Sequence, residues 1–315
     1  MKKTLFLGAK IIVSVGLVLW LVERVDWQGV SQQVYNISLP FLFAYVFLQL
    51  LGTVISARKW QVIASFKSLH FTVKEGFFAY LTGAFINNFL PSTIGGDAYR
   101  SLWLAKHSGA RAAALSTVVF DRFIGLWTLA FFALLSSPLL FPFLKSSLPL
   151  VLVLSALAMF LIFDLIITYA YCQPWFHQLL LRIPFQKVRR LLEEIIFYTK
   201  KHIWWQTSLW SGLFIFVGIA LSNFMLFRAL GSDVGFFAFT SIIFLVTIIS
   251  AVPLSINNIG IKEWAYVTFF ALVGVSIETA ITVALLSRFL QMLISFIALP
   301  QYLSTREQKK APTKI

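Results

Sequence analysis

Long apolar runs recur along the 315-residue chain and constrain its fold more than any other feature. A helix needs about 20 consecutive apolar residues to cross the hydrocarbon core of a bilayer. Six runs meet this length, at about 4–22, 39–57, 112–137, 147–171, 205–228 and 277–300. Only 12% of the residues are charged, whereas soluble domains carry roughly 25%. The sequence therefore predicts an all-α polytopic membrane protein.

The net charge of +14 would suggest a nucleic-acid partner if the protein were soluble. Here Lys and Arg gather in short polar segments after alternate spans, as the positive-inside rule describes. These segments lie near 2–3, 58–74, 182–201 and 306–314. The first apolar run lacks a small-residue cleavage site, so we expect a retained helix rather than a signal peptide. We expect a multi-pass protein of the bacterial inner membrane with both termini cytoplasmic. Its basic loops would contact anionic lipid headgroups, and no nucleic-acid partner is expected.

Two further apolar segments are interrupted, one at about 76–110 by "PSTIGG" and one at about 236–275 by "PLSINNIG". Proline removes a backbone donor and glycine permits a positive φ, so both break helices. If 76–90 crossed the bilayer fully, Arg100 and Lys106 would lie on the side that the other positive charges avoid. We therefore expect two re-entrant helical hairpins that enter from opposite sides, in addition to about six spanning helices.

The two interrupted segments resemble each other, and so do the helices after them. "FLPSTIGGDAYR" has the same order of residue types as "AVPLSINNIGIKE", and "ALSTVVFDRF" aligns with "AITVALLSRF" at an offset of 166. This alignment places Arg122 over Arg288, in helices that the predicted topology runs in opposite directions. Inverted repeats with interrupted helices at the midplane are typical of transporters. We predict a single membrane domain at 1–303, with repeat-like units at about 76–137 and 236–300 and a basic cytoplasmic tail at 304–315.

Polar and charged residues gather at both interruptions and in the helices that follow. A charge at the bilayer centre costs at least about 2.5–3.5 kcal/mol, so such a residue is expected to face a polar interior. Backbone groups freed at the breaks need protein, water or ligand as partners. These features predict a polar cavity at the midplane. Its candidate residues are Asn87, Asn88, Pro91, Ser92, Gly95, Gly96, Asp97, Arg100, Asp121, Arg122, Pro253, Ser255, Asn257, Asn258, Gly260, Lys262, Glu263, Arg288 and Gln291.

We expect these side chains to have different roles. Arginine suits phosphate because its guanidinium donates two parallel hydrogen bonds, and the start of a half-helix also favours an anion. The cations expected to bind a headgroup phosphate are Arg100, Arg122, Lys262 and Arg288. The carboxylates of Asp97, Asp121 and Glu263 would pair with the arginines in the empty state or take up a proton, and the four asparagines would bind headgroup oxygens. The alternative for Asp121 and Arg122 is a structural ion pair.

Catalytic signatures are missing, and neither the single cysteine nor the four histidines have metal-ligand spacing. We therefore expect no cofactor and no enzyme activity. One alternative is a polyprenyl-phosphate-dependent glycosyltransferase, since "ERVD" at Glu23–Asp26 places carboxylates just outside the first span. Another is a non-transporting membrane partner of a lipid-modifying enzyme, which would act through its basic loops, chiefly 172–204.

The motifs "NNFLPSTIGGDAYR", "FDRFIG", "PLSINNIGIKEW" and "SRFLQ" occur in this order. With them the chain resembles the flippase-like membrane domain of lysylphosphatidylglycerol synthases over roughly 5–303. The resemblance implies a flippase that moves an anionic or aminoacylated lipid between leaflets. We also keep a polyprenyl-phosphate-linked lipid as a candidate cargo. Synthases of this family add a soluble aminoacyl-transfer domain after the membrane part. Because the sequence ends at Ile315 after a short basic tail, we expect the translocase half alone.

Overall fold

A computed structural model of the chain describes residues 15–17, 19–23, 25–90, 94–143, 147–171, 186, 189, 193–194, 197–199, 201–251 and 255–300. These residues form helices and short connections, and no strand occurs among them. Most of the expected first span and the basic tail lie outside this part of the chain. The same is true of three candidate site residues, Pro91, Ser92 and Pro253.

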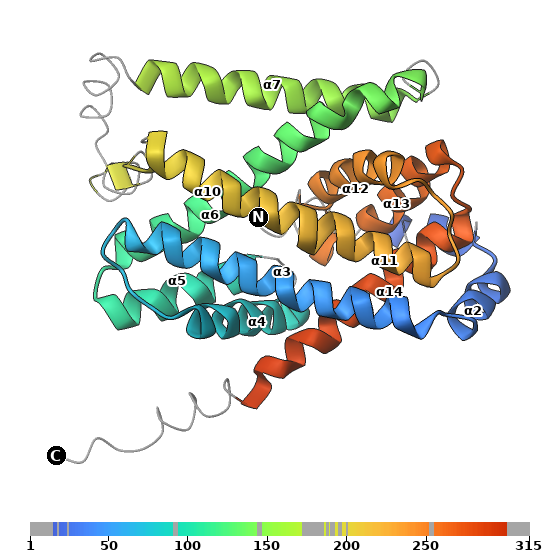
Figure 1. The fold of residues 1–315 in the computed structure, drawn as a ribbon, viewed down its shortest axis with the longest axis horizontal. Coiled ribbons are helices and arrows are strands. Elements are labelled where there is room, and N and C mark those ends of the chain that lie inside the picture. Colours follow the sequence, from blue (N-terminus) through green and yellow to red (C-terminus); the bar gives the residue numbers. More distant parts are fainter. Residues whose placement is uncertain are drawn as a thin grey trace.

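Most of the α-helices follow one another with short connections (Figure 1). In chain order they are α2 (Trp27–Tyr35), α3 (Leu39–Ser65), α4 (Val73–Phe89), α5 (Ile94–Ser108), α6 (Arg111–Ser136), α7 (Leu148–Tyr171), α10 (Lys201–Phe214), α11 (Ser222–Ala229), α12 (Phe236–Ala251), α13 (Ile261–Phe270) and α14 (Ile277–Ser295). A π-helical segment, Ile215–Leu221, joins α10 to α11. Short 3₁₀ segments follow α6 at Ser137–Phe143 and α14 at Phe296–Ala298.

Within the described residues, four helices are long and apolar enough to cross a membrane. They cover Leu39–Ser65, Arg111–Pro142, His202–Ala229 and Ile277–Ala298, and they match four of the predicted spans. Helix α7 occupies a further predicted span, at 147–171. The prediction of an all-α polytopic membrane protein is therefore confirmed.

Helix α3 is longer than the sequence predicted. The expected span ended at residue 57, yet the helix continues to Ser65 and buries Lys59 and Trp60. The hydropathy pattern predicts that the span ends at Arg58 and Lys59, because hydropathy takes no account of the ion-pair partner of a buried charge. Lys59 has one, the carboxylate of Asp121 at 2.9 Å.

Each interrupted segment forms a helical hairpin. Helices α4 and α5 make the first, at the end of the bundle where α3 ends and α6 begins (Figure 1). Helices α12 and α13 make the second, at the opposite end, where α11 ends and α14 begins. The two hairpins therefore enter the bundle from opposite ends, as the sequence predicted.

Small residues let the arms of the first hairpin approach closely. A Cβ added to Gly96 of α5 would lie 2.5 Å from the backbone oxygen of Gly83 in α4, so only glycine fits there. The Asn87 side chain then accepts a hydrogen bond from the Gly96 N–H at 2.7 Å. One arm thus caps an N–H group in the first turn of the other, which has no partner within its own helix.

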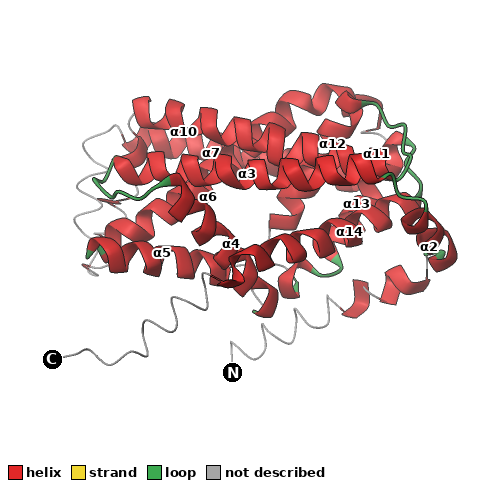
Figure 2. Cartoon of the chain, turned by 60° about the horizontal axis from the view of Figure 1, so that its bottom comes forward, coloured by secondary structure: helices red, strands yellow, loops and turns green. Residues whose placement is uncertain are grey.

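The order of elements occurs twice. A long helix, a hairpin and a second long helix make a first unit of α3 to α6 and a second unit of α10 to α14. The last helix of each unit packs against the hairpin of the other, α6 on α12 and α14 on α4. Figure 2 shows α4, α5 and α14 below α3. The units meet where Gly52 of α3 touches Gly218 of the π-helical segment, two residues that are themselves 166 positions apart. This arrangement suits an inverted repeat, although the repeat boundaries drawn from the sequence stay a prediction.

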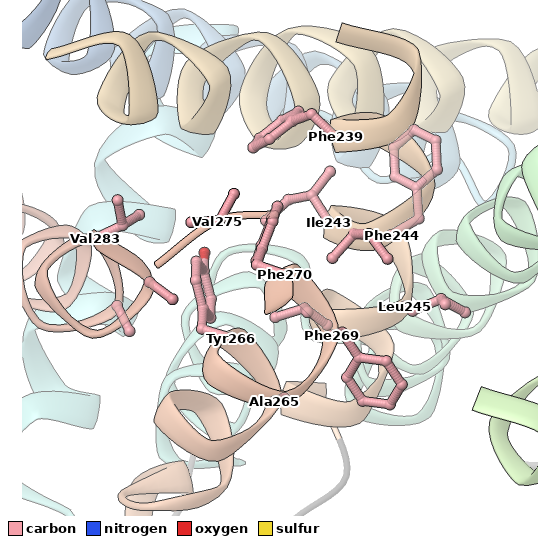
Figure 3. Packing of buried hydrophobic residues seen from close by; sticks show 14 of the residues in the cluster. Phe239, Ile243, Phe244, Leu245, Ala265, Tyr266, Phe269, Phe270, Val275 and Val283 are labelled. Carbon is pink, nitrogen blue, oxygen red and sulfur yellow. The ribbon is translucent and has the colours of Figure 1, made fainter. Parts of the chain in front are cut away.

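The second hairpin is anchored in the largest apolar cluster (Figure 3). Phe270 of α13 lies 4.5 Å from Phe227 and 5.5 Å from Phe239, measured between ring centroids. Tyr266, one turn before Phe270, donates a hydrogen bond to Asn223 of α11 at 3.2 Å. These contacts fix the orientation of α13, and with it the direction of Lys262 and Glu263 in the first turn of that helix.

Candidate functional site

A cavity of about 560 Å³ lies between the two units. Helices α3, α4, α6, α12, α13 and α14 and the π-helical segment all contribute to its wall. Three cations of the described residues line it, namely Arg122 from the first unit and Lys262 and Arg288 from the second. The wall thus brings together three of the four cations that the sequence singled out, from helices that are distant in the chain.

Arg122 is held in place by Asp97, which stands in the first turn of α5. The Arg122 Nε lies 2.7 Å from Asp97 Oδ2, and the Nη2 lies 3.1 Å from Oδ1. The Arg122 side chain is nevertheless 58% exposed. A guanidinium has five N–H donors, and this pair uses two of them. Arg122 therefore still has donors available on the cavity side.

Arg288 makes the equivalent pair in the second unit. Its Nη2 lies 2.8 Å from Glu263 Oε1, and its Nη1 and Nη2 also donate to the carbonyl oxygens of Asn257 and Asn258. Both asparagines have a positive φ, 47° and 58°, which gives the chain its tight turn at the break. In each unit the paired carboxylate and arginine are 25 residues apart. The structure thus brings each of these arginines to the expected carboxylate, and the role of the pairs in transport stays a prediction.

Lys262 has a different environment. Its Nζ donates a hydrogen bond to Ser287 Oγ at 2.8 Å, and the ring of Tyr266 lies 5.7 Å away. Across the described ranges, Lys262 makes no ion pair with a carboxylate. Its charge thus lies on the cavity wall beside Arg288 without a direct counter-ion.

A buried charge network backs the first unit. The Asp121 carboxylate lies 2.9 Å from Lys59 Nζ and 3.0 Å from Arg100 Nη1, and Tyr80 Oη donates to it at 2.6 Å. Arg100 also reaches Asp97 at 2.8 Å, and its guanidinium lies 4.0 Å from the centre of the Tyr80 ring. Arg100 is only 2% exposed and does not line the cavity. The phosphate-binding role expected for Arg100 therefore does not fit its position. Arg100 instead holds Asp97, which in turn holds Arg122.

Sequence reasoning missed Lys59, Tyr80 and Ser287. The apolar residues that continue past Lys59 at helical spacing are the signal that the helix does not end there. Ser287 could have been found from the offset of 166, which places it opposite Asp121. Tyr80 carried no signal of its own, because a tyrosine in an apolar helix is ordinary.

The remaining candidates divide into two groups. Asn257, Asn258 and Gln291 line the cavity. Asn87, Asn88 and Gly260 instead stabilise the hairpins. Asn88 donates to Ser295 at 2.8 Å. Gly260, with φ 86°, is the N-cap of α13, and its N–H donates to Glu263 Oε2. Gly95 lies in the first turn of α5, next to the Leu90 side chain. Ser255 is buried and away from the cavity wall. Four asparagines were expected to bind headgroup oxygens, and the cavity offers this role to two of them.

Asp26, one of the two carboxylates on which the glycosyltransferase alternative rests, has a structural partner. It is the N-cap of α2, and its side chain accepts a hydrogen bond from the N–H of Gln28 at 3.0 Å. Capping an exposed helix start is an ordinary role for aspartate. No observation therefore favours catalysis at this residue.

The fold and the site define a multi-pass helical membrane protein with a cationic cavity between two opposed hairpins. Comparison with known families is consistent with this class, since the model of the lysylphosphatidylglycerol synthase TM region matches residues 8–298. The chain belongs to this family, and the resemblance seen in the sequence is confirmed.

One curated relative is a UPF0104 membrane protein from Methanocaldococcus jannaschii. It is 29% identical to the chain over 126 residues, which are 39% of this chain and 38% of that protein. The match thus spans less than half of the relative's length. No solved structure matches the chain.

Proposed function

We propose that this protein moves a lipid with an anionic headgroup between the leaflets of the bacterial inner membrane. The observation that carries the proposal is the convergence of Arg122, Lys262 and Arg288, from two opposed units, on one cavity of about 560 Å³. Such a volume lies within the range of ligand pockets, roughly 300–1,000 Å³. The headgroup would pass through the cavity while its acyl chains stay in the surrounding lipid.

The ion pairs suggest how the headgroup engages the hairpins. Asp97 and Glu263 lie in the first turns of α5 and α13, and each holds the arginine of the helix that follows its hairpin. A phosphate that enters the cavity competes with these carboxylates for the same guanidinium donors. Binding would therefore loosen the link between each hairpin and its neighbouring helix, so that the hairpins can open the cavity to one side and then to the other.

Transfer of a fluorescent phosphatidylglycerol in liposomes tests the proposal. Wild type is compared with Arg122→Ala and with Arg228→Ala. Arg228 is a matched control because it also pairs with an aspartate, Asp233 at 2.8 Å, yet it does not line the cavity. We expect Arg122→Ala to lose transfer at least about tenfold and Arg228→Ala to retain it. Wild-type transfer by a folded Arg122→Ala protein would contradict the proposal and favour a recruiting role through the basic loops.

A further inference from the structure

The charges around the cavity do not balance. In the first unit Lys59, Arg100 and Arg122 are paired with two carboxylates, Asp97 and Asp121. The second unit has two cations, Lys262 and Arg288, and one carboxylate, Glu263, which pairs with Arg288. Among the described residues that line or back the cavity, each unit therefore has one positive charge in excess. An uncompensated charge away from water is costly, so a ligand that supplies negative charge is strongly favoured there.

One substitution between the units accounts for the exposed charge in the second. Asp121 and Ser287 are 166 positions apart and both precede the cavity arginine of their unit. Asp121 pairs with both Lys59 and Arg100, which lie behind the wall. Ser287 offers Lys262 only a neutral hydroxyl oxygen at 2.8 Å. The positive charge of Lys262 is therefore left on the cavity wall, next to Arg288 and facing the same space as Arg122.

We infer that the cavity selects a headgroup ending in a phosphomonoester dianion, with Lys262 as the residue that determines this selectivity. The inference rests on the proposed function and narrows its substrate. A phosphomonoester carries about −1.5 to −2 charges at pH 7. This charge matches the excess positive charge of the two units together, one from each. The phosphodiester of phosphatidylglycerol carries a single negative charge. An aminoacylated headgroup adds a positive charge to a site that already has too many.

Binding to the purified full-length chain in detergent tests the inference. Phosphatidic acid and phosphatidylglycerol with identical short acyl chains are titrated at pH 7, where the phosphomonoester carries about −1.5 to −2 charges. We expect phosphatidic acid to bind at least about tenfold more tightly. Equal affinities would overturn the inference, while loss of phosphatidylglycerol transfer in Arg122→Ala would still support the proposed function. Failure of this inference can therefore be distinguished from failure of the proposed function.

Inorganic phosphate distinguishes a lipid ligand from a free anion. Displacement of bound phosphatidic acid only at a large excess of inorganic phosphate is the expected result, because the acyl chains add affinity. Equal affinity for inorganic phosphate and phosphatidic acid would overturn the assignment to a lipid.

Two variants locate the selectivity. Ser287→Asp gives Lys262 the counter-ion that Asp121 provides in the first unit, and we expect it to abolish the preference for phosphatidic acid. The same substitution at Ser232, in the loop after α11, is the matched control and should preserve the preference. Because a new carboxylate at a buried position can impair folding, Lys262→Gln provides an independent test with the same expected loss. An unchanged ratio of the two affinities in either folded variant would overturn the role of Lys262.

Discussion

The two units share a skeleton but differ in chemistry. Each has a carboxylate in the first turn of its second hairpin arm, paired with an arginine 25 residues later. Behind that pair the first unit has Asp121 with three partners, Lys59, Arg100 and Tyr80, all within 3.0 Å. The second unit has Ser287 at the equivalent place, whose hydroxyl accepts a hydrogen bond from Lys262 and donates one to the Ala284 carbonyl oxygen. The charges of the first unit therefore mainly stabilise its own hairpin, whereas in the second unit the charge of Lys262 lies on the cavity wall.

Among the variants that test this difference between the units, Asp121→Asn should cause the largest loss of stability. Removing its charge leaves Lys59 and Arg100 buried without their main counter-ion, which costs about 3–5 kcal/mol for a buried pair. We expect a marked loss of folded protein, measured as thermal unfolding in detergent. Ser287→Ala at the equivalent position removes two hydrogen bonds of a neutral hydroxyl, one accepted from Lys262 and one donated to the Ala284 carbonyl oxygen, of about 1 kcal/mol each. Similar losses from the two variants would show that the units do not differ as described.

Gly96→Ala should have the next largest effect. Its new methyl group would meet the backbone of Gly83 in the other hairpin arm, which cannot move aside. Overpacking of this kind costs typically about 1–3 kcal/mol. Gly95→Ala is the control from the same turn, because its nearest obstacle is the end of the flexible Leu90 side chain. The melting temperature should fall more for Gly96→Ala, and the reverse order would refute the close crossing of the two arms.

The smallest effect is expected at the exposed start of α4, outside the four candidate spans. The backbone and side-chain hydrogen bonds of Thr72 lower the pKa of Glu75 below its usual value of 4.5. A lowered folded-state pKa means that this stabilisation is complete above the unfolded pKa and is lost as pH falls through the folded one. Glu75→Gln should therefore melt slightly below wild type at pH 6, and the difference should vanish in stronger acid. A constant difference across this range would exclude the charged capping box as its source.

The outline of the fold could be predicted because hydropathy and helix breakers act locally. The apolar residues of the runs at 39–57 and 277–300 are enough to predict helices. Asn257 and Gly260 interrupt a helix because they readily adopt a positive φ. The offset of 166 also gave the correspondence between Arg122 and Arg288, and the structure adds Asp97 with Glu263 at the same offset.

What escaped prediction depends on partners far away in the chain. Lys59 was placed in a loop because its counter-ion is 62 residues distant, and only the folded chain brings the two together. Arg100 was assigned to the headgroup because sequence gives its charge but not its direction. Its helix turns it towards Asp121 and the Tyr80 ring, away from the cavity. The π-helical segment at Ile215–Leu221 had no sequence signal either, since its residues suit an α-helix equally well.

Native mass spectrometry of the protein extracted in mild detergent is the most direct test of a cavity shared by both units. Wild type, Arg122→Ala, Arg288→Ala and Arg228→Ala would be compared for the lipids that remain bound. A defined lipid species should be retained by wild type and by Arg228→Ala and lost from both cavity variants, one from each unit. The same lipids bound to all four proteins would contradict a headgroup site formed by Arg122 and Arg288 together.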